Sequence, residues 1–228
     1  MEIKDLFSVK GLTFLALFTL ISVIASSINF SEVLGGPSNQ TFTFFQFIGP
    51  IAGGFLGAGV GILSVVLAQL ASFVILGKSL EVINVLRFLP MVFAAFYFAK
   101  YAKGKLTQAA VPLLCMAAFV LHPVGSQAWV YSLYWLIPLI ALILPENLFA
   151  RSLGATFTAH SIGSVIWLYS FPSTPEFWIA LIPVVAFERL LFASGIAVSF
   201  VAFSTVLARV DAIAKSGLIH IDRRYVVA

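Results

Sequence analysis

The hydrophobic pattern of the chain consists of long runs that contain no Asp, Glu, Lys or Arg and are rich in Leu, Ile, Val, Phe and Ala. The uncharged runs cover residues 11–31, 33–77, 106–145, 152–175 and 190–208. About 20 apolar residues are enough for a helix to cross a bilayer. The runs do not alternate between apolar and polar positions, as the strands of a membrane barrel would. The pattern therefore predicts an all-α, polytopic transmembrane helical bundle.

The composition strengthens this prediction. Of the 228 residues, 61% are hydrophobic and 10% are charged, whereas soluble domains are about 25% charged and about half apolar. We expect a single integral membrane domain over residues 1–228, with the lipid bilayer of the cell membrane around it. The lone cysteine, Cys115, lies in an apolar run and cannot form a disulfide within the chain.

Basic residues indicate which ends of the helices face the cytoplasm, because Lys and Arg in short loops stay on that side. Lys4 and Lys10 place the N-terminus inside, and the cluster of Lys100, Lys103 and Lys105 marks a second inner loop. The apolar helix before that cluster, over residues 82–101, must then begin outside. The uncharged run 33–77 would therefore cross the membrane twice.

A glycine-rich stretch inside that run, "GPIAGGFLGAGVG", supplies the turn between the two crossings. We expect helices over 44–55 and 60–76, with a cytoplasmic turn at residues 57–59. A single helix over the whole run would be about 50 Å long, against a hydrocarbon core of about 30 Å. Four glycines at four-residue spacing also present a bare stripe for close helix packing, namely Gly49, Gly53, Gly57 and Gly61.

The full pattern predicts about eight spans, within a range of six to eight, and both termini in the cytoplasm. The expected spans are 12–28, 44–55, 60–76, 82–101, 107–122, 127–144, 152–170 and 177–208. Residues 209–228, which contain both basic and acidic side chains, are expected to form a solvated cytoplasmic tail.

Ionisable residues inside a span are costly and are therefore candidates for function. Glu188 and Arg189 lie eleven and twelve residues into the last span, about 16–18 Å below the outer surface at a rise of about 1.5 Å per residue. His160 lies at a similar depth on the preceding helix, so the three side chains could meet. Alternatively, Glu188 and Arg189 form a purely structural pair and His160 is a satisfied packing residue.

Two further groups of polar residues extend this candidate site. Thr156, His160, Ser164 and Trp167 recur at steps of four, four and three, which puts them on one helix face. A second group is expected near the outer surface, where an interfacial belt or snorkelling could also explain it. Its substrate-binding candidates are Gln46, Asn84, Arg87, His122, Trp129 and Trp167.

Motifs for other chemistry are missing from the sequence. The three histidines and the cysteine have no metal-ligand spacing, and no GxSxG or HExxH motif occurs. Gly77, Lys78 and Ser79 resemble the end of a phosphate-binding loop, but Ser72 stands where its first glycine should be. We therefore expect no catalytic residues, no metal, no cofactor and no nucleic-acid partner.

The first hundred residues resemble the substrate-binding S components of energy-coupling-factor vitamin transporters. The resemblance covers about residues 10–105 and rests on "LTFLALFTLISVIASS", "FIGPIAGGFLGAGVGILSVVLAQL" and "NVLRFLPMVFAAFYFAK" followed by a basic loop. It implies a glycine-rich hairpin of helices two and three, and a first helix whose small residues dock to a transmembrane coupling subunit. Ser22 and Ser26 stand where the family has a pair of alanines, and the family has six spans.

The sequence therefore favours a non-enzymatic membrane subunit that binds a small, vitamin-like solute and is driven by a coupling subunit and partner ATPases. Three alternatives remain open at this point. The chain could be a self-sufficient proton-coupled transporter that uses Glu188 and His160, an intramembrane enzyme acting on lipid with the same two residues, or a structural subunit of a larger complex.

Overall fold

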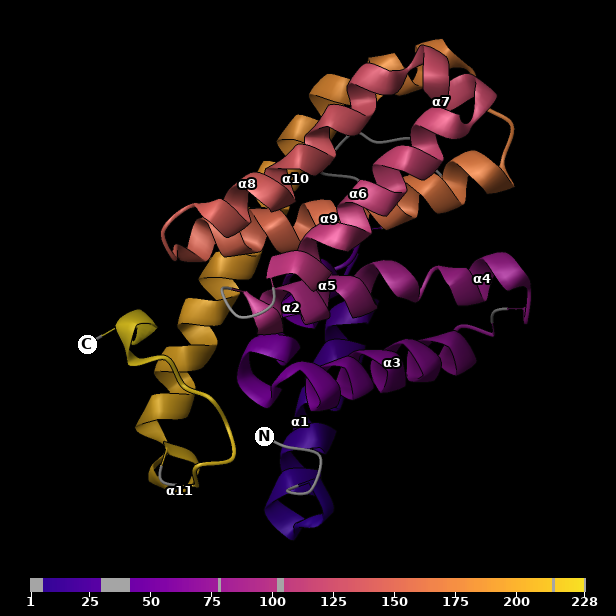
Figure 1. The fold of residues 1–228 in the computed structure, drawn as a ribbon. Helices are drawn as coiled ribbons and strands as arrows, with labels where there is room; N and C mark the ends of the chain where they lie inside the picture. The colour runs from indigo at the N-terminus through magenta and orange to yellow at the C-terminus, as the bar shows by residue number, and fades with distance from the viewer. Residues whose placement is uncertain (1–5, 30–41, 78, 102–104, 215, 228) are drawn as a thin grey trace.

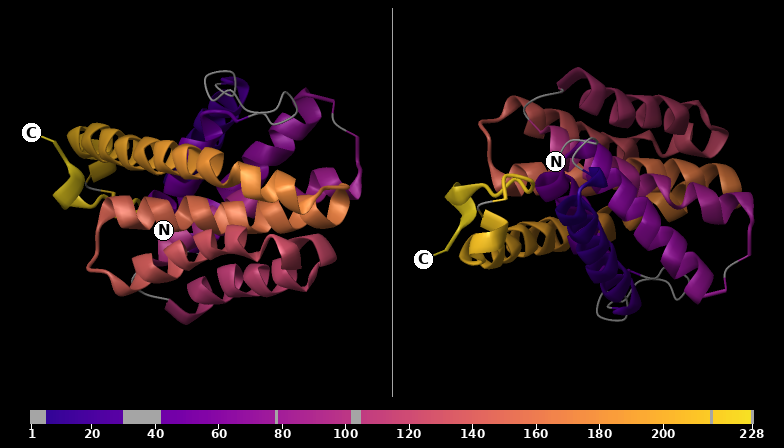
Figure 2. Two further views of the ribbon diagram at one scale, coloured as in Figure 1. Left: turned by 90° about the horizontal axis from the view of Figure 1, so that it is seen from above. Right: turned by 90° about the horizontal axis from the view of Figure 1, so that it is seen from below.

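The structure is a computed structural model that describes residues 6–29, 42–77, 79–101, 105–214 and 216–227. The described residues contain helices and no strand, and one isolated antiparallel bridge pairs Asn29 with Thr43. The helices form two layers, with α1–α5 in one and α6–α9 with the first part of α10 in the other (Figures 1 and 2). Helices α5 and α9 pack against each other where the layers meet.

Within the described ranges, four helices are long and apolar enough to cross a membrane, which supports a membrane location. They are Val9–Ser27, Ala58–Ile75, Val82–Lys100, which includes a short break, and Pro175–Arg209. Three shorter apolar helices are Phe45–Leu56, Lys105–Leu121 and Trp129–Ile143. The expected count of eight crossings and the side of the two termini stay predictions.

The glycine-rich stretch breaks the chain into two helices, as the sequence predicts. Helix α2 (Phe45–Leu56) ends and α3 (Ala58–Ile75) begins at Gly57, whose φ of 79° suits a residue without Cβ. The predicted three-residue turn is too long, because Ala58 and Gly59 already belong to α3.

Three of the four stripe glycines allow close packing, and Gly57 instead makes the turn. A Cβ on Gly53 would lie 2.2 Å from the carbonyl oxygen of Ala95 in α5, and one on Gly49 would lie 2.5 Å from the sulfur of Met91. A Cβ on Gly61 would lie 2.6 Å from the Cα of Gly53. The stripe therefore brings α2 close to both α3 and α5.

Helix α1 (Val9–Ser27) runs parallel to α3, as expected for helices separated by one crossing. The hydroxyl oxygens of Thr19 and Ser64 are 3.3 Å apart, and those of Ser26 and Ser72 are 2.6 Å apart. Ser22 is fully buried. The small residues Ser22 and Ser26, predicted from the sequence to serve helix packing, therefore contact α3 or the interior of this chain.

The expected continuous helix over 82–101 is interrupted, which is a second correction. Helix α4 (Val82–Leu86) is separated from α5 (Leu89–Lys100) by Arg87 and Phe88. Pro90 occupies the first turn of α5 and has no N–H to continue the earlier helix. The side-chain amide of Gln69 in α3 donates a hydrogen bond to the Phe88 carbonyl oxygen at 3.3 Å, next to this break.

The next segment forms α6 (Lys105–Leu121), after which α7 (Pro123–Gln127) forms a short turn of helix. The expected helix over 127–144 begins instead as a 3₁₀ helix, η3 (Trp129–Trp135), and continues as α8 (Leu136–Ile143). Hydroxyl groups on α5 tie α8 in place, because Tyr97 donates to the carbonyl oxygen of Pro138 at 2.7 Å.

Helix α9 (Leu148–Ser170) is the polar centre of the second layer. It buries hydroxyl side chains along its length and packs against α5, α6, α8 and α10. Gly154 on α9 accommodates the ring of Tyr97 from α5, since an added Cβ would lie 2.2 Å from the tyrosine oxygen. Near its first turn, the Arg151 Nε donates a hydrogen bond to the Phe98 carbonyl oxygen at 2.7 Å.

Helix α10 (Pro175–Arg209) would be about 52 Å long at about 1.5 Å per residue, so it exceeds the thickness of a hydrocarbon core. The C-terminal half of α10 extends beyond the other helices of the second layer (Figure 1). A chain segment with α11 (Asp211–Ala214) and η4 (Arg223–Tyr225) follows it.

That C-terminal segment is not simply the solvated tail that the sequence predicts. Ile219 is buried in the main core, and the backbone N–H of His220 donates to the Phe55 carbonyl oxygen near the end of α2. Arg224 pairs with Glu146 in the α8–α9 loop at 3.0 Å and with Asp222 at 2.6 Å. Hydrogen bonds from Arg224 hold the pKa of Asp222 below its usual range. Apolar residues between the charged ones explain why the segment packs back.

Candidate functional site

The described part of the chain contains two cavities of similar size that are lined by polar side chains. The serine cavity, of about 390 Å³, lies between α1, α3 and α4 and includes Ser26, Ser27, Gln69 and Ser72. The ion-pair cavity, of about 350 Å³, lies between α9, α10 and the start of α2 and includes Glu188 and Arg189. Both volumes fall in the range of small-molecule sites.

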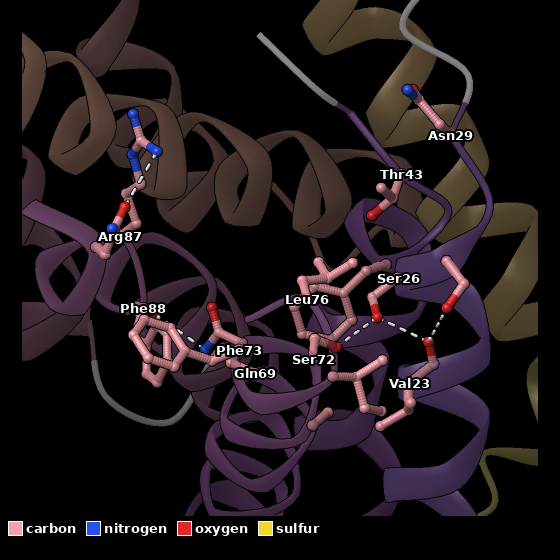
Figure 3. A pocket seen from close by; sticks show the side chains of 15 residues that line it. Val23, Ser26, Asn29, Thr43, Gln69, Ser72, Phe73, Leu76, Arg87 and Phe88 are labelled. Carbon is pink, nitrogen blue, oxygen red and sulfur yellow. Dashed lines mark hydrogen bonds between the residues drawn. The ribbon is translucent and has the colours of Figure 1, made fainter. Parts of the chain in front are cut away.

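The polar side chains of the serine cavity bond to backbone carbonyl oxygens and to one another (Figure 3). Ser26 donates to the Val23 carbonyl oxygen at 2.7 Å, so the hydroxyl of Ser72, 2.6 Å away, donates to Ser26. Gln69 points toward Phe88 and donates to its carbonyl oxygen (Figure 3). This arrangement joins α1, α3 and the α4–α5 break and leaves few polar groups in need of a partner.

Arg87 lines both cavities, because it lies in the break between α4 and α5. Its Nη1 donates to Asn84 Oδ1 at 3.4 Å, a long hydrogen bond, and the Asn84 amide donates to the carbonyl oxygen of Ser79 at 3.1 Å. The Arg87 side chain is exposed, and in Figure 3 it points away from the paired serines. Asn84 lines the serine cavity.

Glu188 and Arg189 form a buried ion pair on α10. Arg189 Nη2 is 3.2 Å from Glu188 Oε2, and the two residues are 4% and 5% exposed, respectively. Arg189 Nη1 donates to Thr156 Oγ1 at 3.4 Å, and its guanidinium carbon lies 4.3 Å from the ring centre of Phe192. The Arg189 Nε has no hydrogen-bond partner among the described residues. A buried pair of this kind is costly unless further groups satisfy it.

His160 lines the same cavity, but its hydrogen bonds go to aromatic and hydroxyl groups. The indole N–H of Trp135, which can only donate, is 3.1 Å from His160 Nδ1, so Nδ1 carries no proton. The imidazole proton therefore lies on Nε2, 2.8 Å from the Tyr131 hydroxyl oxygen, and Ser164 lies 3.4 Å from the same nitrogen. These partners hold His160 neutral, with a defined tautomer.

The structure brings most of the predicted binding residues together. Around the ion-pair cavity it places Gln46, Arg87, His160, Trp167, Glu188 and Arg189. Two others lie apart from both cavities. His122 caps α7 by accepting from the Val124 N–H and meets the Tyr169 ring edge to face, and Trp129 is 51% exposed.

Several aromatic residues of the site were not among the predicted binding residues. Tyr131, Phe177 and Trp178 line the ion-pair cavity, and Trp135 sets the His160 tautomer. They belong to the aromatic segments "WVYSLYW" and "EFW", which the interfacial belt also explains. The four-residue spacing of Tyr131 and Trp135 was an available signal, although a 3₁₀ helix rather than an α-helix presents them both to His160.

The site shows no grouping that suits a metal. Among the described residues, no group of three or more His, Cys, Asp or Glu side chains could hold a metal ion. In comparisons with known proteins, no family model, no curated protein and no solved structure matches this chain. What defines the site is therefore its own chemistry: a buried ion pair, a neutral imidazole and aromatic walls around one cavity.

Proposed function

We propose that the chain is a membrane-embedded subunit that binds a small solute in the ion-pair cavity and takes part in its uptake. The observation that carries this proposal is the buried Glu188–Arg189 pair on the wall of a cavity of about 350 Å³. Ionisable groups at such depth in a helical membrane protein commonly mark a substrate or ion pathway.

The other walls of the cavity suit a small organic solute better than an inorganic ion. Phe177 and Trp178 from α10 and Tyr131 from η3 present aromatic surfaces, while Gln46 and Ser164 add neutral polar groups. Mostly apolar walls with a few placed polar groups are typical of small-molecule sites. The site lies between helices, as binding sites in helical bundles commonly do.

The resemblance of residues 10–105 to energy-coupling-factor S components supports a more specific form of the proposal. In that form the solute is vitamin-like, and a transmembrane coupling subunit with partner ATPases drives its uptake. Because Ser22 and Ser26 pack inside this chain, the coupling subunit would contact the outer face of α1, where Leu17, Leu20 and Ile24 are exposed.

A proton-coupled transporter that works alone is the second candidate, since Glu188 is a buried carboxylate on the cavity wall. The partners of His160 argue against a relay of two titrating residues. Trp135 donates to Nδ1, so a proton on that nitrogen would face the indole N–H. Proton coupling would then depend on Glu188 alone.

The test of solute binding is mass spectrometry of small molecules retained by the purified protein, with two cavity-filling variants. Gly163→Leu would fill the ion-pair cavity, because a Cβ at Gly163 meets only Pro90, at 3.9 Å. Ser27→Leu would fill the serine cavity from an exposed position and serves as the matched control. We expect a solute that the native protein and Ser27→Leu retain and Gly163→Leu loses. A solute lost only from Ser27→Leu, or no retained solute, contradicts the proposal.

A further inference from the structure

The hydrogen-bonding capacity left over at the ion pair defines the kind of ligand that fits beside it. Glu188 Oε2 is used by Arg189, while the other carboxylate oxygen, Oε1, has no hydrogen bond to the described residues. Arg189 Nε likewise lacks a partner there, and its Nη1 bond to Thr156 is long, at 3.4 Å. Glu188 and the Arg189 guanidinium, on adjacent residues that line the cavity, therefore keep unused capacity to accept and to donate a hydrogen bond.

The charges around the deep part of the cavity cancel. Glu188 and Arg189 neutralise each other, and the hydrogen bond from Trp135 keeps His160 neutral. Among the described residues that line this part of the cavity, the facing helices contribute no other charge, since α2 supplies Gln46 and α9 supplies Ser164. Arg87, the remaining charged lining residue, is exposed. A ligand with a net charge at the pair would therefore be buried without a counter-charge, which is costly.

From these two features we infer that the ion-pair cavity recognises a neutral, planar ring by a lactam edge, that is, an N–H next to a C=O. The ring N–H donates to Glu188 and the carbonyl oxygen accepts from Arg189, which satisfies both leftover groups. The aromatic side chains of Tyr131, Phe177 and Trp178 provide flat surfaces for the ring. Because it names the ligand class of this cavity, the inference rests on the proposed function.

Two nearly isosteric probes test the lactam edge on the native protein. In 2-quinolone the ring N–H adjoins the carbonyl, and in coumarin a ring oxygen replaces that N–H, so an acceptor would face the Glu188 carboxylate. We expect 2-quinolone to bind about 10- to 150-fold more tightly than coumarin, the ratio that corresponds to one hydrogen bond to a charged group. The fused-ring anion 2-naphthoate should bind more weakly than 2-quinolone. Isothermal titration of the detergent-solubilised protein measures all three affinities.

A pair of variants assigns the discrimination to the ion pair. The glutamine amide in Glu188→Gln can donate or accept, so this variant should bind 2-quinolone and coumarin with similar affinity. Glu176→Gln removes an exposed carboxylate from the same helix and should keep the native ratio. If Glu188→Gln does not fold, the probe series on the native protein still decides.

Several outcomes would overturn the inference. These are equal affinity for 2-quinolone and coumarin, tighter binding of 2-naphthoate, or no binding of any probe. The proposed function is judged separately, by the solute that the native protein retains and Gly163→Leu loses. A retained solute that is anionic or lacks a lactam edge would overturn the ligand class and leave the proposed binding function intact.

Discussion

The serine cavity and the ion-pair cavity have nearly the same volume, about 390 and 350 Å³, yet their chemistry differs. In the serine cavity, Ser26, Ser72 and Gln69 use their hydrogen bonds to join helices. In the ion-pair cavity, Glu188 and Arg189 are buried charges with capacity left over. The two cavities therefore differ in how far their polar groups are satisfied and not in their volume.

The two layers of the molecule also differ in how their helices pack. The layer of α1–α5 is held by glycine contacts such as Gly53 against Ala95, and its core is apolar. The second layer is held by aromatic rings and hydroxyls around α9, where Phe119 stacks on Tyr131 and meets Trp178 edge to face. Tyr131 and Trp178 of this aromatic cluster also line the ion-pair cavity.

The largest expected effect breaks the ion pair itself. In Glu188→Gln the Arg189 guanidinium would stay buried without its counter-charge, which typically costs about 3–5 kcal/mol. We expect that loss in the free energy of unfolding, measured by titration with a denaturing detergent in mixed micelles. The exposed Glu176→Gln should change it by less than about 0.5 kcal/mol. Equal stability of the two variants would show that the pair is solvated.

A smaller effect is expected from the hydrogen bonds around His160. Tyr131→Phe removes the oxygen that accepts from His160 Nε2 and leaves a buried N–H, at a cost of about 1–3 kcal/mol. Tyr134→Phe is the control, because the Tyr134 hydroxyl only donates to the Ile182 carbonyl oxygen of α10. Nitrogen NMR of His160 should show the proton on Nε2 in the native protein. A proton on Nδ1 would contradict the assigned tautomer.

In the serine cavity, removal of a hydrogen-bonding side chain should lower the free energy of unfolding by less. Ser26→Ala removes hydrogen bonds to Ser72 and to the Val23 carbonyl oxygen, worth about 0.5–1.5 kcal/mol each in net terms. Ser27→Ala removes only an exposed bond to the same carbonyl and should be close to neutral. The unfolding titration compares the two. A cost for Ser26→Ala as large as that for Glu188→Gln would remove the contrast between the cavities.

The smallest effect on stability is expected at Arg87, which both cavities share. Its guanidinium is exposed and makes one long hydrogen bond, so Arg87→Ala should change the free energy of unfolding by less than about 0.5 kcal/mol. Thermal unfolding of the variant in detergent measures this. A loss above about 1 kcal/mol would mean that Arg87, like Arg189, is part of a buried polar network.

Local sequence features predicted much of the fold. Long apolar runs are enough to specify helices, and Gly57 breaks α2 from α3 because its positive φ disfavours other residues. Counting depth along two helices also predicted that Glu188, Arg189 and His160 would lie near one another. These predictions succeed because they depend on backbone conformation and helix rise, which neighbouring residues determine.

Contacts between distant segments decided the rest. The break at Arg87 and Phe88, the packing of residues 216–227 against α2 and α10, and the inward orientation of Ser22 follow from how the helices meet. The neutral tautomer of His160 depends on Trp135, 25 residues away in sequence. The sequence by itself determined a helical chain with apolar helices long enough to cross a membrane and with charges at mid-helix. Tertiary packing alone decided that Arg189 also meets Thr156 of α9, because such a bond requires side chains from two distant segments to come within hydrogen-bonding distance.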